Sequence, residues 1–287
     1  MCPRHFRHIP FFKWKMTLFN NKMSIARTRV YYRNKFLHIG HLQTLFHNNN
    51  VARGTSGRCY AIIDDRQDPL RISDVQEDFD YLELDHVELV SVHKNTPSIL
   101  EYTLSLVDKG LVYMHYCSTM EHNPERIANS IRNPQMHFRL MLRCGLGEDP
   151  VIGYTKQLTE TAPGPHFNHT PLTIVFIFDY IIKVLDKILN ITDVISTGTN
   201  TTDITDVREP NISLFFDRDK PIKYHRLDTY FIQGFKYSKK DWPALNERDP
   251  HLLTIKGLKA RKVPRTVLYA FYLHAVQMST IKITFLG

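Results

Sequence analysis

The feature that most constrains the fold is an alternation of short apolar, β-branched runs with longer segments of helical spacing. The runs from Ile25 to Val30 and from Arg58 to Ile63 have the composition of strands, and two aspartates follow the second run. Helical spacing follows each run, from His38 to about Asn50 and from Asp74 to Leu84. This order is typical of a parallel, doubly wound sheet. We therefore predict an α/β fold with a Rossmann-like core.

The middle of the chain departs from this alternation. Phe138 to Arg143 and Val151 to Lys156 have the character of antiparallel strands. Thr173 to Phe178 is fully apolar instead, as a strand buried on both faces of a parallel sheet would be. Pro and Gly cluster at 163–165 between these segments. We predict a smaller α+β subdomain inserted into the parallel sheet, with the chain returning to that sheet at 173–178.

Charge is spread unevenly over the 287 residues. The first 63 hold 11 of the 37 Lys and Arg side chains and none of the 29 carboxylates, although the net charge of the whole chain is only +8. A basic, acid-free block with interleaved aromatic side chains suits a phosphate-bearing partner such as RNA. Residues 1–23 also have the basic character of a mitochondrial presequence. Both interpretations stay open at this point.

Cysteine usage and hydropathy exclude several classes of protein. The four cysteines form no CxxC pair and do not combine with histidines into a ligand pattern, so we expect reduced thiols and no protein-bound zinc. No apolar run approaches the roughly 18–20 residues that a membrane helix needs. A hydrophobic fraction of 43% excludes a disordered chain. The sequence predicts a soluble protein without a membrane partner, cytoplasmic or, from its basic N-terminus, mitochondrial.

Three segments carry residues suited to nucleotide chemistry. His38-Ile39-Gly40-His41 opens the first helix, where two imidazoles can hydrogen-bond phosphates and a glycine lets a nucleotide approach the backbone at the positively polarised helix end. Residues 236–240 read KYSKK and place two lysines and a serine downstream. Residues 249–261 then read DPHLLTIKGLKAR.

These segments resemble the signatures of class I aminoacyl-tRNA synthetases. LHIGH is similar to the HIGH motif, and 236–240 is similar to the KMSKS loop. Residues 249–261 resemble the DDPRLxTIxGLRRRG stretch that follows KMSKS in glutaminyl-tRNA synthetases and in eukaryotic or archaeal glutamyl-tRNA synthetases. Ile63 to Pro69 resembles the family's RFDDTNP, and the likeness extends over about residues 25–275.

The resemblance implies ATP-dependent activation of glutamine or glutamate to an aminoacyl-adenylate, followed by transfer to a tRNA acceptor end. Lys239 would stabilise the α-phosphate as pyrophosphate leaves, and His38 and His41 would be the other catalytic residues. ATP would bring Mg²⁺ as its counter-ion. The residues implied in ATP binding are His38, Gly40, His41, Lys236, Ser238 and Lys239.

The resemblance also implies an amino-acid site. Arg29 would bind the substrate carboxylate and Asp64 its α-amino group, while Phe178 and Ser196 would lie near its side chain. Glutamyl enzymes carry an arginine where this chain has Ser196. Because a small neutral residue cannot pair with a buried carboxylate, this position favours glutamine over glutamate.

The resemblance predicts five parts along the chain. They are a basic N-terminal extension (1–23), the first half of the nucleotide-binding fold (24–93), an inserted acceptor-end-binding subdomain (94–168), the second half with the KMSKS-like loop (169–240), and the start of a stem-contact helical region (241–287). The chain ends at Gly287, so we expect no anticodon-binding module. Its oligomeric state is not indicated by the sequence.

Several positions depart from the family pattern. Residues 31–36 lack the Pro and Gly of the family's PPEPNG stretch, and Asp193 replaces a histidine that faces the nucleotide, where a carboxylate would repel phosphate. These departures support an alternative function. The protein would then be a catalytically degenerate synthetase-like protein that serves as an RNA- or protein-binding module.

Overall fold

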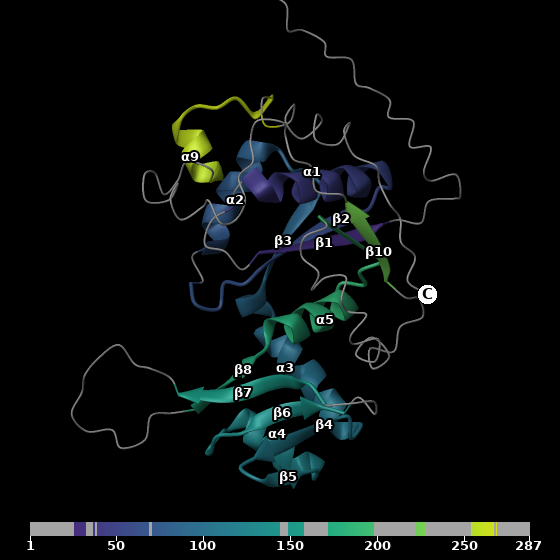
Figure 1. The fold of residues 1–287 in the computed structure, drawn as a ribbon, viewed down its shortest axis with the longest axis vertical. Helices are drawn as coiled ribbons and strands as arrows, with labels where there is room; N and C mark the ends of the chain where they lie inside the picture. The colour runs from purple at the N-terminus through teal and green to yellow at the C-terminus, as the bar shows by residue number, and fades with distance from the viewer. Residues whose placement is uncertain are drawn as a thin grey trace, which may run out of the picture.

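The architecture consists of two five-stranded sheets at opposite ends of an elongated molecule, with helices α3 and α5 between them (Figure 1). A computed structural model of the chain describes residues 26–32, 37, 39–68, 71–143, 149–157, 172–197, 222–227, 254–266 and 268. No helix among these residues is long and apolar enough to cross a membrane. The N-terminal extension and the KMSKS-like segment lie outside the described residues.

The first sheet is parallel throughout, in the order β10-β9-β1-β2-β3. Its strands are β1 (Arg27–Tyr32), β2 (Arg58–Ile63), β3 (Val87–Ser91), β9 (Asp193–Thr197) and β10 (Lys223–Leu227). The chain fills one half of the sheet outward from β1 and then returns to fill the other half outward from β9. This is the doubly wound order of a Rossmann-like fold, so the predicted fold class is confirmed.

Helices cover both faces of the parallel sheet. On one face, α1 (Ile39–Gly54) and α2 (Arg71–Leu82) pack against Ala61 and Ile63 of β2. On the other face, α3 (Val92–Asp108) and α5 (Phe178–Ile188) share a core with Tyr60 and Ile62. Five consecutive β2 residues are buried, as expected for a strand covered on both faces.

The second sheet is antiparallel, in the order β5-β4-β6-β7-β8. Its strands are β4 (Val112–Tyr116), β5 (Thr119–Glu121), β6 (Arg139–Leu142), β7 (Val151–Gln157) and β8 (Leu172–Phe176). Helix α4 (Pro124–Arg132) packs with α3 and β4. The predicted antiparallel character of this part of the chain is confirmed.

The predicted return to the parallel sheet at 173–178 is wrong. β8 pairs antiparallel with β7 at the edge of the second sheet, and the chain re-enters the parallel layer only through α5 and β9. Phe178 consequently begins α5 instead of ending a strand. A short apolar run does not specify which sheet it joins, and most of β8 is only half-buried. The five predicted parts of the chain stay a prediction.

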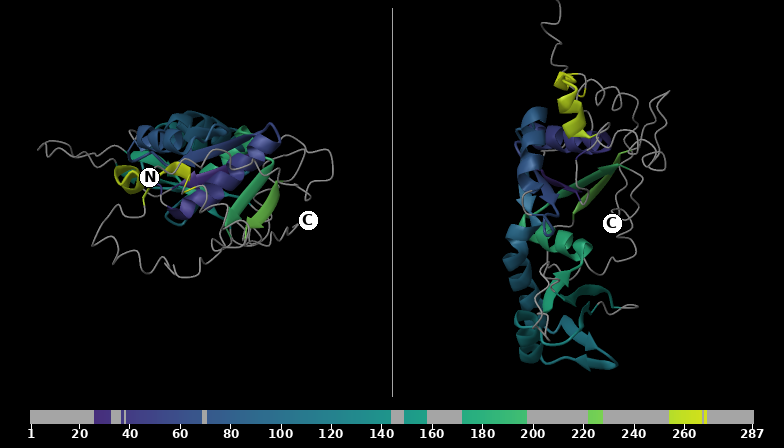
Figure 2. Two further views of the ribbon diagram at one scale, coloured as in Figure 1. Left: turned by 90° about the horizontal axis from the view of Figure 1, so that it is seen from above. Right: turned by 90° about the vertical axis from the view of Figure 1, so that its left-hand side faces the viewer.

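Helix α3 contacts both sheets, through β3 and β4, and is seen from a second direction in Figure 2. Its start is held by side chains: Ser91 Oγ accepts a hydrogen bond from the Lys94 N–H at 3.0 Å, and Asp65 accepts one from the His93 N–H at 2.8 Å. Gly110, at a φ of +70°, follows its end. The contacts of Ser91 and Asp65 place the first residue of α3 at Val92.

Residues 254–266 return to the first half of the fold. Ile255, at the start of α9 (Ile255–Ala260), is fully buried against α1 and α2, and its N–H donates to the Leu37 carbonyl at 3.0 Å. Lys259 Nζ lies 3.7 Å from carboxylate oxygens of both Glu77 and Asp78 on α2. The start of α9 is therefore held beside Leu37, two positions before the first residue of α1.

Asp78 makes the docking of α9 pH-dependent. Burial raises the pKa of this carboxyl from 3.8 to about 6; the Lys259 charge opposes that shift, and Asp74 and Glu77 add to it. Because the folded state binds this proton more tightly than the unfolded state does, the free energy of unfolding falls as the pH rises from 3.8 to about 6 and Asp78 ionises. We expect Asp78→Asn to raise the free energy of unfolding at neutral pH by about 1–3 kcal/mol, at about 1.36 kcal/mol per pKa unit.

Urea denaturation at neutral pH and near pH 3.5 measures this gain, which should vanish at the lower pH. Glu77→Gln is the matched control, since Glu77 also meets Lys259 but its side chain is 75% exposed. A neutral-pH gain for Asp78→Asn no larger than that of the control would contradict the role of burial.

Candidate functional site

The parallel sheet changes winding direction between β1 and β9. From β1 the chain continues through α1 to β2 on one side, and β9 with its partner β10 lies on the other. In doubly wound sheets ligands bind outside the carboxyl ends of the strands at such a switch point. The candidate site is therefore the edge formed by the ends of β1, β2 and β9, which are Tyr32, Ile63 and Thr197.

The N-terminus of α1 lies at this edge, directly after β1. The helix has 16 residues and no acidic side chain in its first turn, so no carboxylate of that turn offsets the partial positive charge of the helix N-terminus. Gly40 and the partly buried His41 belong to that turn, and His38 lies outside the described residues. This arrangement fits an anionic ligand such as the phosphates of ATP.

Arg29, predicted to bind the substrate carboxylate, is the third residue of β1 and is buried against α5. Its Nε donates to Asp186 Oδ1 at 2.8 Å and its Nη2 to Oδ2 at 3.2 Å. The two side chains are 4% and 1% exposed. Arg29 therefore already has a carboxylate partner within the chain, and its predicted role stays a prediction.

Asp64, predicted to bind the α-amino group, is the first residue after β2 and lies at the candidate edge. Arg66 holds it in a two-pronged ion pair, with Nε to Oδ1 at 2.7 Å and Nη2 to Oδ2 at 2.8 Å. Arg66 also donates from Nη1 to the Phe176 carbonyl at 2.7 Å. Sequence reasoning missed Arg66, although a basic residue two positions from Asp64 was a visible signal.

The neighbouring aspartate, Asp65, has a structural role. Asp65 is 1% exposed, and its carboxylate accepts from Ser91 Oγ at 2.5 Å as well as from the His93 N–H. It therefore fixes the end of β2 to the start of α3. The consecutive aspartates divide into a partly exposed one at the edge and a buried one that holds the turn.

The remaining predicted residues are spread over several elements. Phe178 is 5% exposed within the core shared by α3 and α5. Ser196 lies one residue before the carboxyl end of β9, paired with Arg226 of β10. Lys236, Ser238 and Lys239 lie outside the described residues.

Asp193 was expected to face the nucleotide and repel its phosphates. It is the first residue of β9, paired with Thr28 of β1, and so lies at the amino end of the strand. Four residues of a strand place it about 13 Å from the carboxyl edge. Asp193 thus lies at the opposite end of its strand from the candidate site, and the expected repulsion of phosphates stays a prediction.

Among the described residues, one face of the second sheet is covered by no helix, and we call it the open face. The other face packs Met114, Leu140 and Phe176 into the core with α3 and α4. On the open face, direct cross-strand pairing places five side chains in one row. They are Met120, His115, Arg139, Tyr154 and Val175. Arg139 is exposed, and Met120 and Tyr154 are among the large apolar side chains that remain exposed.

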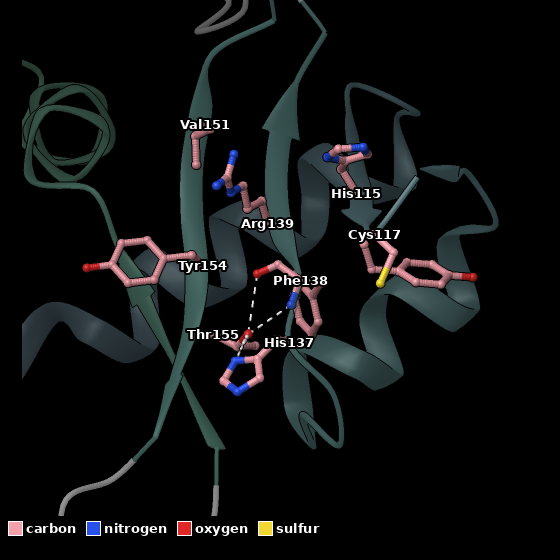
Figure 3. Close-up of a pocket in the computed structure, with 9 residues that line it drawn as sticks. His115, Cys117, His137, Phe138, Arg139, Val151, Tyr154 and Thr155 are labelled. Carbon is pink, nitrogen blue, oxygen red and sulfur yellow. Dashed lines mark hydrogen bonds between the residues drawn. The ribbon is translucent and has the colours of Figure 1, made fainter. Parts of the chain in front are cut away.

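A shallow depression of about 580 Å³ lies on β4, β6 and β7. Its lining residues are drawn in Figure 3. His115, His137, Arg139 and Tyr154 are among its lining residues. Thr155 also lines it, and its hydroxyl accepts from the Phe138 N–H at 2.9 Å and lies 3.4 Å from His137 Nδ1. The depression thus combines aromatic, imidazole and guanidinium groups.

A second cluster of cationic and aromatic groups lies on the same sheet. The Arg143 guanidinium lies 5.9 Å from the centre of the Tyr113 ring, and Arg143 Nη2 lies 3.1 Å from His122 Nδ1. A guanidinium can only donate, so Nδ1 of His122 is the acceptor of this hydrogen bond. Burial, with a smaller contribution from Asp149, raises the pKa of Tyr113, so this phenol stays protonated. The cluster combines one guanidinium with an imidazole and a phenol ring.

Thiols and metal-binding side chains add no further centre within the described residues. No three His, Cys, Asp or Glu side chains gather there as a metal site requires, and the expectation of no zinc stays a prediction. Cys59 is fully buried, and burial raises the pKa of its thiol to about 12, whereas Cys117 is exposed. Cys59 is therefore a core residue and not a nucleophile.

Comparisons with known proteins agree with the sequence resemblance. Residues 33–144 match the family model described as tRNA synthetases class I (E and Q), catalytic domain. The chain is also 28% identical over 153 residues to the Glutamyl-Q tRNA(Asp) synthetase of Citrobacter koseri. That match covers 52% of this chain and 47% of the relative, so the chain spans about half of that protein.

Of two similar solved structures, the first supports a likeness of the fold alone. A glutamate tRNA ligase from Elizabethkingia meningosepticum, crystallised in complex with its amino acid, superposes with a TM-score of 0.51 at 12% identity, covering 80% of this chain and 54% of that one. The glutamate-tRNA synthetase from Elizabethkingia anophelis gives a TM-score of 0.49 at 12% identity, covering 80% and 55%.

Asp186→Ala tests the buried ion pair. Removing Asp186 takes away the carboxylate that accepts from Nε and Nη2 of the buried Arg29 guanidinium, so we expect the free energy of unfolding to fall by about 3–5 kcal/mol. Asp179→Ala, an exposed change in the first turn of the same helix, should cost less than about 1 kcal/mol. Urea denaturation of the two variants beside the unmodified chain measures both. A loss for Asp186→Ala as small as the control's would show that Arg29 does not depend on Asp186.

Proposed function

We propose, on the premise that residues 33–144 belong to the catalytic-domain family of the class I tRNA synthetases for glutamate and glutamine, that this chain activates glutamine with ATP and transfers it to a tRNA acceptor end. Glutamate is the alternative amino acid, and the neutral Ser196 favours glutamine. The chain spans about half of the relatives it matches. We therefore assign to it the activity of the adenylate-forming core of such an enzyme.

The observation that carries this proposal is the position of α1. Its first turn lies at the carboxyl edge of the parallel sheet, next to the switch point between β1 and β9, and it contains Gly40 and His41 of the HIGH-like segment. A helix N-terminus free of carboxylates at that place suits a triphosphate. Asp64 lies at the end of the neighbouring strand β2, where an amino acid would meet the α-phosphate.

In the proposed reaction the chain positions two substrates and stabilises charge. Bound ATP supplies the adenylyl group, and the amino-acid carboxylate is itself the nucleophile, so no general base is required. His38, His41 and the first turn of α1 would hold the phosphates, and Lys239 would stabilise the negative charge that develops on the α-phosphate. Asp64 would orient the amino acid by pairing with the α-ammonium group of that substrate.

Pyrophosphate exchange tests the activity. We expect the protein to exchange labelled pyrophosphate into ATP when glutamine is present, with tRNA supplied in a parallel reaction. Lys239→Ala should lower kcat/KM by the equivalent of about 2–4 kcal/mol of transition-state stabilisation. Lys262→Ala, an exposed lysine just beyond α9, is the matched control and should leave the rate unchanged. Folded protein that exchanges no pyrophosphate with any amino acid, with or without tRNA, would refute the enzymatic function.

A second function is favoured by the open face of the second sheet. The row containing His115, Arg139 and Tyr154 presents cationic and aromatic groups side by side, which is the combination that binds single-stranded RNA by phosphate contact and base stacking. At the candidate site, meanwhile, Arg29 and Asp64 are each paired within the chain. An RNA-binding protein without catalysis would retain the open-face row, and the internal pairing of Arg29 and Asp64 would not impair it.

RNA binding tests this alternative. Tyr154→Ala should weaken binding of a single-stranded RNA about tenfold, because one base loses its stacking partner. Arg139→Ala should weaken binding and reduce the slope of log K against log salt by about 0.7. Arg132→Ala, at the end of α4 on the covered side of the sheet, is the control. Affinities equal to the control's in a filter-binding titration would exclude this face as the RNA site.

A further inference from the structure

Arg66 uses every nitrogen of its guanidinium within the chain. Nε and Nη2 donate to the two oxygens of Asp64 at 2.7 and 2.8 Å, and Nη1 donates to the Phe176 carbonyl at 2.7 Å. The pair is not a core feature, because the side chains of Arg66 and Asp64 are 26% and 19% exposed. It lies at the carboxyl end of β2, at the edge where the candidate site was located.

The geometry of the pair bears on what Asp64 can bind. A planar guanidinium matches a carboxylate with two parallel hydrogen bonds, whereas an ammonium group meets it as a single point charge. An α-ammonium group that approaches Asp64 therefore faces oxygens that already accept strong hydrogen bonds, and a neighbouring charge of its own sign. It must displace Arg66 to make a full ion pair.

We propose that Arg66 is an internal competitor for Asp64 and thereby a specificity-determining residue of the site. It lowers the affinity of ligands that are recognised through a free α-ammonium group and leaves ligands without that group unaffected. This inference rests on the proposed function, which assigns Asp64 to the α-amino group of the substrate.

The surroundings allow Arg66 to leave without disturbing Asp64. Asp65, the next residue, is anchored independently by Ser91 and the His93 N–H, so the turn after β2 keeps its shape when Arg66 moves. The Phe176 carbonyl holds the guanidinium by a separate hydrogen bond, which can persist when Nε and Nη2 release the carboxylate. Release of Arg66 therefore breaks one partly exposed ion pair and leaves the hydrogen bonds of Asp65 in place.

Calorimetric titration with two ligands tests the inference. Glutamine carries the α-ammonium group, and glutaramate is the same molecule without it. We expect Arg66→Ala to bind glutamine about tenfold more tightly than the unmodified chain, the factor that one charge-assisted hydrogen bond supplies, and to bind glutaramate with unchanged affinity. Arg66→Lys, which keeps the charge but loses the fork, should give an intermediate ratio of the two affinities.

Arg58→Ala is the matched control. Arg58 lies on the same strand and also pairs with a carboxylate, Glu88 at 2.7 Å, but the two side chains are 67% and 50% exposed and Arg58 stands at the opposite end of β2. Its replacement should change neither affinity. A thermal melt of each variant checks that it is folded, and if Arg66→Ala is not, the ratio measured for Arg66→Lys decides.

The outcomes separate this inference from the proposed activity. Equal changes for both ligands, no change, or no glutamine binding by folded Arg66→Ala would overturn the role of Arg66, since removing a competitor must expose Asp64. Pyrophosphate exchange by the unmodified chain together with an unchanged affinity ratio would overturn only the inference. Selective glutamine binding by Arg66→Ala without exchange would support the inference and refute the activity.

Discussion

The buried ion pair between Arg29 and Asp186 is the interaction on which the arrangement of the molecule depends. It joins β1, at the centre of the parallel sheet, to α5, which enters the chain only after the whole antiparallel sheet. Both side chains are almost fully removed from water, where the opposite charge of each stabilises the other. The pair fixes α5 against β1. The next strand along the chain, β9, pairs with β1. The switch point of the sheet, and with it the candidate site, follows from this placement.

The two sheets are coupled through a shared core instead of being joined by a flexible connection. Side chains of β2, β3, α3 and α5 form one hydrophobic cluster with those of β4, β6 and β7. Within it, the Tyr180 hydroxyl of α5 lies 2.8 Å from the Thr103 hydroxyl of α3, and burial raises the pKa of this phenol, so the pair stays neutral. A ligand held by the open face of the second sheet would therefore keep a fixed relation to the edge of the first. An enzyme that delivers an acceptor end to an adenylate needs such a relation.

Charge at the candidate edge is balanced by the chain itself. Asp64 is neutralised by Arg66, which also reaches the last residue of β8, so the acidic end of β2 is tied to the second sheet. The first turn of α1 has no such partner among its own residues. The described edge therefore has a helix N-terminus without an acidic side chain in its first turn on the side where phosphates would lie, and a paired carboxylate on the side where an amino acid would lie. This asymmetry explains why the proposed catalytic and RNA-binding functions both remain consistent with the same geometry.

The sequence by itself indicated β1, α1, β2 and α2 of the parallel half but not β3, β9 or β10; β2 was visible because it is buried on both faces and reads as an unbroken apolar run. The sequence also determined the position of the HIGH-like turn after β1. Tertiary structure decided what local patterns do not encode. β8 has the composition of a parallel strand but pairs with β7, because its partner is chosen by packing. Asp193 proved to lie at the amino end of its strand, and Arg29 and Asp64 proved to have ion-pair partners, because contacts between side chains far apart in the chain, or across a tight turn, exist only once the fold brings them together.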